Sequence, residues 1–425
     1  MPNRKCSIPS QPLTAACIAL AILTCIAIST QAQAQTFTLL HAFRGGDGDG
    51  QNPGDGALIL DGRGNLFGTT MLGGSGACDG GCGTVYRVAP SGKTALLYAF
   101  TGTNGDGKYP DGALARDAEG NFYGTTYGGG TSGSACNGYG CGTVFKLDTS
   151  GHETVLYNFS GGVDGATPYS ALVLDSAGNL YGTTQDGGTY GWGTVYKVDS
   201  SGNETVLHSF DGPNGDGGDA FAGLTMDSAG NLYSTTQGGG VFDAHCLPGL
   251  AVGCGTIFKI TTAGDETVLY KFTGHQDGNT PFAGVLRDGQ GNLYGTSQPE
   301  GSNPPFWGAV YKLEPSGKFI VLHDFSGGAG GADPLANVIA DSQGNLYGTT
   351  SAGGSGGCNY YLGGGCGTIF KLSRTGQFSI LYNFMGTPDG ADVSSALVMD
   401  AKGNLYGAAS WYGPNNEGSV FRITP

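Results

Sequence analysis

Four glycine-rich segments of the sequence each hold a pair of cysteines, the residues here with the clearest covalent chemistry. The pairs are Cys78 and Cys82, Cys136 and Cys141, Cys246 and Cys254, and Cys358 and Cys366. A local disulfide in each segment is the economical interpretation, because each segment contains a single pair. Zinc is the alternative, favoured by His245 beside Cys246, but a structural zinc site needs four ligands and no segment has a second pair.

Acidic loops containing Asp-Gly form a second group of candidate residues. Calcium takes several carboxylate and carbonyl oxygens from flexible loops, so we consider Ca2+ a possible cofactor of these segments. The candidate ligands are Asp47, Asp49, Asp106, Asp111 and Asp216. Asp-Gly is also a common turn pair, and no loop has the complete EF-hand pattern, so turn chemistry remains the alternative.

Aromatic side chains in the same class of segment form the third group. Trp192 and Trp307 occupy the position where other segments place their second cysteine. Aromatic rings around a concave face suit the rings of a glycan. The candidate ligand-binding residues are Tyr190, Trp192, Phe306, Trp307, Tyr360, Tyr361, Trp411 and Tyr412. The alternative is that these rings pack the segments down where no disulfide does.

Catalytic motifs are not conspicuous. The sequence contains no nucleophile elbow, no HExxH zinc motif and no phosphate-binding loop. His41, His208 and His323 stand where other copies of a repeated element have tyrosine, which predicts a structural role. Catalytic residues are therefore unassigned, and an enzyme is the less favoured interpretation.

A sevenfold internal repeat must position all of these residues. The element GNLYGTT or a close variant begins at residues 64, 120, 178, 230, 291, 344 and 403. Three further elements, typified by SALVLD, GTVYKV and ETVLYNF, recur with it, and each is a short run rich in β-branched and aromatic residues. Four strands in each of seven repeats predict an all-β fold, a seven-bladed β-propeller with one four-stranded sheet per blade.

The order of the elements predicts how the ring closes. The repeat region opens on a lone strand of the ETVLYNF type at 37–43 and ends on a strand of the GTVYKV type at 418–423. The N-terminal strand should therefore pair with the last blade as its outermost strand, which removes an open edge. Along each blade we expect the order SALVLD, GNLYGTT, GTVYKV and ETVLYNF from the axis outward.

Glycine content, which first suggests disorder, agrees with this fold. The 425 residues include 83 glycines, but only 12 % of residues are charged and 10 % are aromatic, the reverse of a disordered chain. Much of the glycine recurs at fixed positions of the repeat. We expect residues 35–425 to form a single propeller domain.

The N-terminus has the features of a secretory signal peptide. Arg4 and Lys5 precede an apolar run at 13–28, and Ala32-Gln33-Ala34 provides a cleavage site. We expect cleavage after Ala34, no transmembrane segment thereafter, and a protein that is secreted or held at the cell surface or in the periplasm. Removing Arg4 and Lys5 leaves 17 basic residues against 34 acidic ones, so the net charge of −17 argues against nucleic acid as a partner.

The loops divide unequally between the two faces of the ring. The turns of the DSAGN and DSSGN types are short and fall on one face, so the cysteine segments and the Asp-Gly loops share the other. Variable loops on a rigid scaffold are the usual place for function. We therefore expect a monomeric, non-enzymatic binding protein that takes a glycan or a protein on the long-loop face. A polysaccharide lyase or hydrolase using that face, and a structural envelope protein, are the alternatives.

The repeat DSAGNLYGTT…GTVYKVDSSGNETVLHSF resembles the Gloeo/Verruco-type tandem-repeat propellers, also described as choice-of-anchor proteins, over residues 36–425. The resemblance implies an exported or surface propeller. Many members of that family carry a C-terminal sorting tail, whereas this sequence stops at Thr424-Pro425 after its last strand, so we expect release rather than anchorage. The DxxGNLY turn is also similar to that of lactonase and NHL-type propellers.

Overall fold

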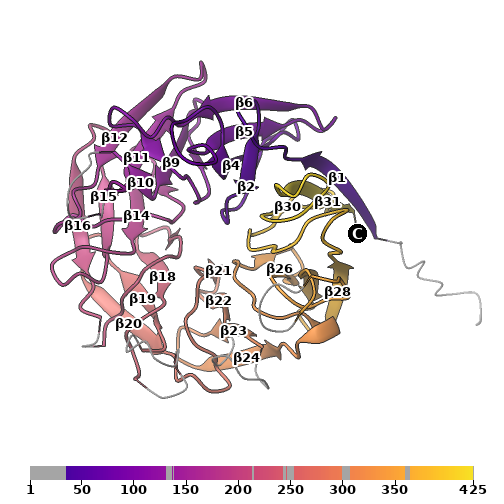
Figure 1. The fold of residues 1–425 in the computed structure, drawn as a ribbon. Coiled ribbons are helices and arrows are strands. Elements are labelled where there is room, and N and C mark those ends of the chain that lie inside the picture. Colours follow the sequence, from indigo (N-terminus) through magenta and orange to yellow (C-terminus); the bar gives the residue numbers. More distant parts are fainter. Residues whose placement is uncertain are drawn as a thin grey trace, which may run out of the picture. The chain divides into compact units, whose positions relative to one another are not determined.

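A computed structural model describes residues 35–130, 136, 138–212, 215–242, 246, 253–298, 307–358 and 364–424. The predicted signal peptide, residues 1–34, lies outside these residues. Residues 35–425 form one compact unit. In that unit seven antiparallel sheets of four principal strands follow one another around an axis, which confirms the predicted seven-bladed propeller (Figure 1).

Each blade is a meander whose strands follow the predicted order from the axis outward. Blade 1 consists of β3 (Ile59–Leu60), β4 (Leu66–Gly73), β5 (Thr84–Val88) and β6 (Thr94–Ala99). Blade 2 consists of β8 (Ala115–Arg116), β9 (Phe122–Thr126), β11 (Thr143–Leu147) and β12 (Glu153–Asn158). Blade 3 consists of β13 (Val173–Leu174), β14 (Leu180–Thr184), β15 (Thr194–Val198) and β16 (Glu204–Ser209). Blade 4 consists of β17 (Thr225–Met226), β18 (Leu232–Thr236), β19 (Thr256–Ile260) and β20 (Glu266–Lys271).

The remaining blades repeat this pattern. Blade 5 consists of β21 (Leu286–Arg287), β22 (Leu293–Ser297), β23 (Ala309–Leu313) and β24 (Phe319–Asp324). Blade 6 consists of β25 (Ile339–Ala340), β26 (Leu346–Thr350), β27 (Thr368–Leu372) and β28 (Phe378–Asn383). Blade 7 consists of β29 (Val398–Met399), β30 (Leu405–Ala409), β31 (Ser419–Thr424) and β1 (Thr36–Ala42). Short extra elements are β2 (Gly50–Pro53) on β4, the pair β7 (Gly107–Lys108) and β10 (Gly128–Gly129), and the 3-10 helix η2 (Gly328–Gly330).

Ring closure occurs as the order of the repeats predicts. Strand β1 pairs with β31 in antiparallel register, from Thr36 opposite Thr424 to Ala42 opposite Ser419. In all seven blades the pairing of the third and fourth strands slips by one residue at the same place, as between Val85 and Tyr86 of β5. Such a bulge bends and twists the outer strand.

The core lies between adjacent blades. A buried phenylalanine follows each outer strand and meets edge-on the aromatic ring of the third strand in the next blade. Ring centroids are 5.0–5.4 Å apart in Phe43–Tyr86, Phe100–Phe145, Phe159–Tyr196, Phe210–Phe258, Phe272–Tyr311, Phe325–Phe370 and Phe384–Phe421. Edge-to-face pairs of this kind stabilise beyond the burial of their area. The seven pairs join every blade to the next.

The aspartate side chain of the recurrent DxxGN turn accepts the hydrogen bonds that close the turn. In blade 3 the Asp175 side chain accepts hydrogen bonds from the backbone of Ala177 and Asn179, from the Asn179 amide and from the Tyr181 hydroxyl, at 2.7–3.1 Å. Burial is the largest single effect and raises the pKa of Asp175, but the hydrogen bonds from these donors together outweigh it by favouring the ionised form, so the pKa lies below its usual value. The short-loop face is thus built from repeated turns, which leaves the opposite face to carry the variation.

Candidate ligand-binding site at the axial mouth

A cavity of about 330 Å3 lies on the axis, where the inner segments of the blades converge. One residue from the same repeat position of each blade lines it. These seven residues, which we call the axial ring, are Asp55, Asp111, Tyr169, Phe221, Phe282, Leu335 and Ser394. The residues that follow each of them are small because the inner segments crowd together; a side chain at Gly56, for example, would overlap the backbone of Ala113.

Strained backbone surrounds the axial ring. Seven non-glycine residues shortly before the axial ring in sequence, one per blade, have positive φ angles between 35° and 61°. They are Asn52, Tyr109, Thr167, Asp219, Thr280, Asp333 and Asp392. For bulky or β-branched residues such as Tyr109 and Thr167 this conformation is a genuine outlier, of the kind that clusters at functional sites.

Neighbouring blades hold these strained residues in place. The N–H of each donates a hydrogen bond of 2.8–3.3 Å to a carbonyl of the preceding blade. The acceptors, in order from Asn52 onward, are Glu417, Cys82, Cys141, Trp192, Cys254, Trp307 and Cys366. Cysteine and tryptophan therefore occupy equivalent positions, as the sequence predicts. Their common structural role is to accept this hydrogen bond through the backbone carbonyl, whichever side chain is present.

One side of the mouth is aromatic. Five rings form a continuous arc, Tyr109–Tyr127–Tyr169–Phe221–Phe282, with successive centroids 5.3, 4.6, 5.1 and 5.4 Å apart. The planes of neighbouring rings differ by 22–36°, so the rings are stacked or gently tilted. The arc runs from blade 2 to blade 5, and Phe282 at its end is 38 % exposed. Tyr169, Phe221 and Phe282 line the axial cavity, and Tyr127 and Tyr109 continue the arc beyond it. Large aromatic rings in a cavity are typical of ligand-binding surfaces.

The other side of the mouth is acidic. The Asp55 side chain is exposed where it lines the axial cavity, and its carboxylate accepts a hydrogen bond from the Ser394 hydroxyl. Burial raises the pKa of Asp55, and the two serine hydroxyls beside it, Ser394 and Ser410, partly offset that effect. Burial and the Asp55 charge raise the pKa of Asp111 to about 7, although its side chain accepts a hydrogen bond from the backbone N–H of Asp55 at 3.1 Å.

Two further carboxylates extend the acidic side. Burial, followed by the charges of Asp55 and Asp333, raises the pKa of Asp392 to about 7. Burial also raises the pKa of Asp333, against hydrogen bonds from Ser351 and Gln298. Across the mouth, burial and the charge of Asp186 raise the pKa of Asp219 to about 6. Groups that titrate near neutral pH in a cleft are candidates for a functional site.

The tryptophans predicted to bind a ligand do not come together. Trp192 packs between blades 3 and 4, in contact with Gly212, and Trp307 packs between blades 5 and 6, in contact with Gly327. Trp411 of blade 7 lines a hollow of about 120 Å3 that adjoins the acidic side of the mouth. Of the three, Trp411 is the one in contact with the axial site.

The other predicted aromatic residues are scattered. Tyr190 is 61 % exposed on the outer part of its loop. Tyr412 lies beside the Cys358–Cys366 disulfide. Phe306, Tyr360 and Tyr361 lie outside the described residues.

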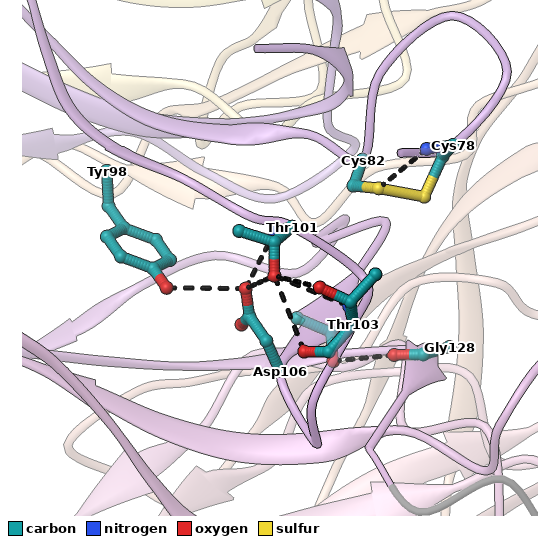
Figure 2. Close-up of a disulfide and its surroundings, with 8 residues drawn as sticks. Cys78, Cys82, Tyr98, Thr101, Thr103, Asp106 and Gly128 are labelled. Atoms are coloured by element: carbon teal, nitrogen blue, oxygen red, sulfur yellow. Dashed lines mark hydrogen bonds between the residues drawn. A yellow bond between two sulfur atoms is a disulfide. The ribbon is translucent and has the colours of Figure 1, made fainter. Parts of the chain in front are cut away.

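The acids considered for calcium are also divided. Asp106 accepts hydrogen bonds from the Tyr98 hydroxyl and from the backbone and hydroxyl of Thr101, so it closes its own loop (Figure 2). Asp49 and Asp216 do the same with His41 and His208 in place of tyrosine, at 3.1 and 2.9 Å. Asp47 is exposed, and Asp111 belongs to the axial ring. Within the described ranges, no three His, Cys, Asp or Glu residues gather in a metal-binding group.

All four predicted disulfides are present: Cys78–Cys82, Cys136–Cys141, Cys246–Cys254 and Cys358–Cys366. Figure 2 shows Cys78–Cys82 above the Asp106 loop. The second cysteine of each pair supplies the carbonyl that holds a strained residue of the next blade. The disulfides therefore help to hold the backbone next to the axial ring in place.

Sequence reasoning missed most of the mouth. Of the axial ring, only Asp111 was a predicted candidate, as a ligand of calcium. The other positions gave no signal from residue type, because their residue types differ between blades. A positional signal exists: in every repeat one large or polar residue stands immediately before the small residues of the inner strand. Aligning the repeats by that position would have gathered the axial ring.

Comparison with known proteins places the chain by family and fold. Residues 26–247 and 245–425 match the Gloeobacter/Verrucomicrobia repeat, and the chain belongs to that family. No curated protein matches the sequence. No helix in the described part of the chain is long and apolar enough to cross a membrane.

Solved structures show the same fold at low identity. The extracellular domain of a protein assigned as a one-component system of B. thetaiotaomicron is 16 % identical with a TM-score of 0.51, over 89 % of this chain and 41 % of that one. This chain thus spans about two fifths of that protein's length. A gluconolactonase of Xanthomonas campestris is 16 % identical with a TM-score of 0.42, over 74 % of this chain and 85 % of that one. Identities at this level show the fold alone.

Proposed function

We propose that the protein is an exported binding propeller that holds a carbohydrate at the axial mouth of its long-loop face, without chemical conversion. The observation that carries the proposal is the arc of five aromatic rings from Tyr109 to Phe282. Four disulfides support export, because such bonds persist in oxidising compartments.

The chemistry of the mouth suits a sugar better than an apolar ligand. Sugar rings present C–H faces that stack on aromatic rings, and their hydroxyls need hydrogen-bond partners. The aromatic arc supplies the first, and the carboxylates of Asp55, Asp111 and Asp392 supply acceptors across the cavity. At about 330 Å3, the axial cavity falls in the usual range for small-ligand sites.

Binding of a panel of oligosaccharides by calorimetry tests the proposal. Phe221→Ala and Tyr169→Ala each remove a ring from the centre of the arc, and we expect each to weaken binding about tenfold, since a stacked ring contributes roughly 1.4 kcal/mol or more. Tyr190→Ala is the matched control, because Tyr190 is an exposed aromatic of the same face away from the mouth. Loss of binding in the control with normal binding in the arc variants would place the ligand on the outer loops instead.

A carbohydrate-active enzyme is the second candidate, favoured by one observation. Asp111 and Asp392 have pKa values of about 7, as a general acid working near neutral pH requires. Incubation with the polysaccharides that bind, followed by assay for new reducing ends and unsaturated products, separates the two functions. Product formation that disappears in Asp111→Asn would establish the enzyme, and intact polysaccharide would leave the binding protein.

A further inference from the structure

Negative charge on one side of the axial mouth has no counter-charge. The residues that line the axial cavity and the adjoining hollow include Asp55, Asp111 and Asp392, and none of those described is lysine, arginine or histidine. The Asp392 carboxylate receives no hydrogen bond within the described part of the chain, in contrast to the serine-bonded Asp55. An unpaired carboxylate in such surroundings is unfavourable unless a partner arrives.

The hollow beside the axial cavity also contains a buried hydrogen-bond acceptor without a donor, the side-chain oxygen of Asn52. Asn52 is 3 % exposed and lines the hollow with Asp55 and Asp392, and its side-chain oxygen has no hydrogen-bond partner in the described structure. Buried polar atoms are almost always hydrogen-bonded, so an exception needs an explanation. Both Asn52 and Asp392 are also held in the left-handed backbone conformation. The wall therefore combines acceptors that lack donors with strained backbone.

We propose that this acidic pocket, formed by Asn52, Asp55, Asp111 and Asp392, binds a protonated primary amine carried by the ligand. The inference rests on the proposed function. If the aromatic arc binds a glycan, the acidic pocket selects glycans that contain amino sugars with free amino groups. The ammonium supplies three donors and a positive charge to a site made of acceptors. The sugar ring to which it is attached lies toward Tyr169 and Phe221.

The walls favour an organic cation over a metal ion. Besides the polar residues and Pro53, the hollow of about 120 Å3 is lined by Met71, Leu335 and Trp411. A hard metal ion takes six to eight oxygens and gains nothing from thioether, leucine or indole groups. An ammonium on a carbon skeleton packs its apolar part on such groups, and an indole face also attracts a cation.

Two oligosaccharides of equal length provide the test, one of glucosamine and one of N-acetylglucosamine, since they differ at the nitrogen and in its charge. We expect the glucosamine oligomer to bind at least tenfold more tightly, and Asp392→Asn to remove about tenfold of that affinity, as expected for a charge-assisted hydrogen bond. Asp219→Asn is the matched control. Asp219 occupies the same repeat position in blade 4 and has the same backbone conformation, but it lies beside the aromatic arc. Asp111→Asn repeats the test if Asp392→Asn does not fold.

The outcomes separate this inference from the proposed function. Equal binding of both oligomers, lost in Phe221→Ala, overturns the amine pocket and leaves carbohydrate binding intact. Binding of spermidine that depends on Asp392, with no binding of either oligomer, supports the pocket and overturns the carbohydrate. Binding of Ca2+ that depends on Asp392 and displaces the glucosamine oligomer overturns the amine in favour of a metal ion.

Discussion

Six of the seven seams between blades are built in one of two ways, and the seventh, at blade 1, has Thr94 at the position that differs. At the outer edge, a residue at the start of an outer strand, the first residue in most blades and the second in β1, lies beside a tyrosine or histidine on the outer strand of the preceding blade. In the second half that residue is phenylalanine, stacked on its neighbour in Tyr270–Phe319, His323–Phe378 and Phe37–Tyr382 with centroids 4.1, 3.6 and 4.5 Å apart. We call these the aromatic seams.

In blades 2 to 4 the same position is glutamate. Glu153, Glu204 and Glu266 lie beside Asp106, Asp164 and Asp216 of the preceding blades, and we call these the acidic seams. Burial, together with the neighbouring aspartate, raises the pKa of each glutamate to about 7. In all three the Oε1 atom is buried without a hydrogen-bond partner.

The comparison teaches that one backbone geometry accepts two kinds of contact with different dependence on pH. A stacked phenylalanine contributes the same burial at any pH. A glutamate whose pKa is raised on folding contributes to the free energy of unfolding in its protonated form. The contribution is complete below the unfolded pKa of about 4.5 and is lost as pH rises through the folded pKa of about 7.

The largest effect is expected from converting an aromatic seam into an acidic one. Phe319→Glu removes the ring stacked on Tyr270 and places a carboxylate beside Asp277, which already accepts a hydrogen bond from the Tyr270 hydroxyl. We expect the free energy of unfolding to fall by about 3 kcal/mol at pH 8 and by about 2 kcal/mol at pH 5. Urea unfolding at both pH values measures it. An equal loss at the two pH values would show that only the ring matters.

A smaller effect is expected from neutralising the acidic seams together. In the triple variant Glu153→Gln, Glu204→Gln and Glu266→Gln, unfolding at pH 8 should require more free energy than in the wild type. Because solvent screens these half-exposed groups, the gain is about 1 kcal/mol per seam at most, and it should be much smaller at pH 5 and absent below the unfolded value of about 4.5. Comparing the two proteins at each pH cancels the titration of Asp111, Asp219 and Asp392 at the mouth. A gain that is equal at pH 5 and pH 8 would contradict the proton-linked origin.

The smallest effect is expected from converting an acidic seam into an aromatic one. Glu204 lies beside Tyr157 and Asp164. These residues form the same hydrogen-bonded pair as Tyr270 and Asp277, which lie beside Phe319. Glu204→Phe should therefore stack on Tyr157 and stabilise the protein by about 1 kcal/mol at pH 8. The melting temperature of this variant against Glu204→Gln separates the stacking from the removal of charge, and equal values would mean that the new ring does not stack.

The fold was predictable from sequence to the level of strand order, whereas the site was not. Repeats such as GNLYGTT fix the strands because the same backbone and core contacts recur in every blade, and the paired cysteines fix their own disulfides through proximity. Innermost strands such as β3 are two residues long, shorter than the element GALILD at 56–61 suggests, because the residues before them line the channel outside the ladder. The function proposed for the mouth depends on differences between blades, such as Tyr169 in blade 3 against Ser394 in blade 7, and these differences form no pattern along the chain.

The closing of the ring by β1 and β31 also fixes when each part of the mouth can form. Blades 2 to 5, which carry the aromatic arc, are complete well before the last strand is synthesised, and the disulfides of blades 2 and 4 join residues no more than eight positions apart. The acidic pocket instead spans the junction, with Asn52 and Asp55 from the start of the chain and Asp392 from its final blade. Strand β1 must wait for residues Ser419–Thr424 before it has a partner. The acidic pocket therefore takes its final form only after synthesis has reached β31 and the ring has closed.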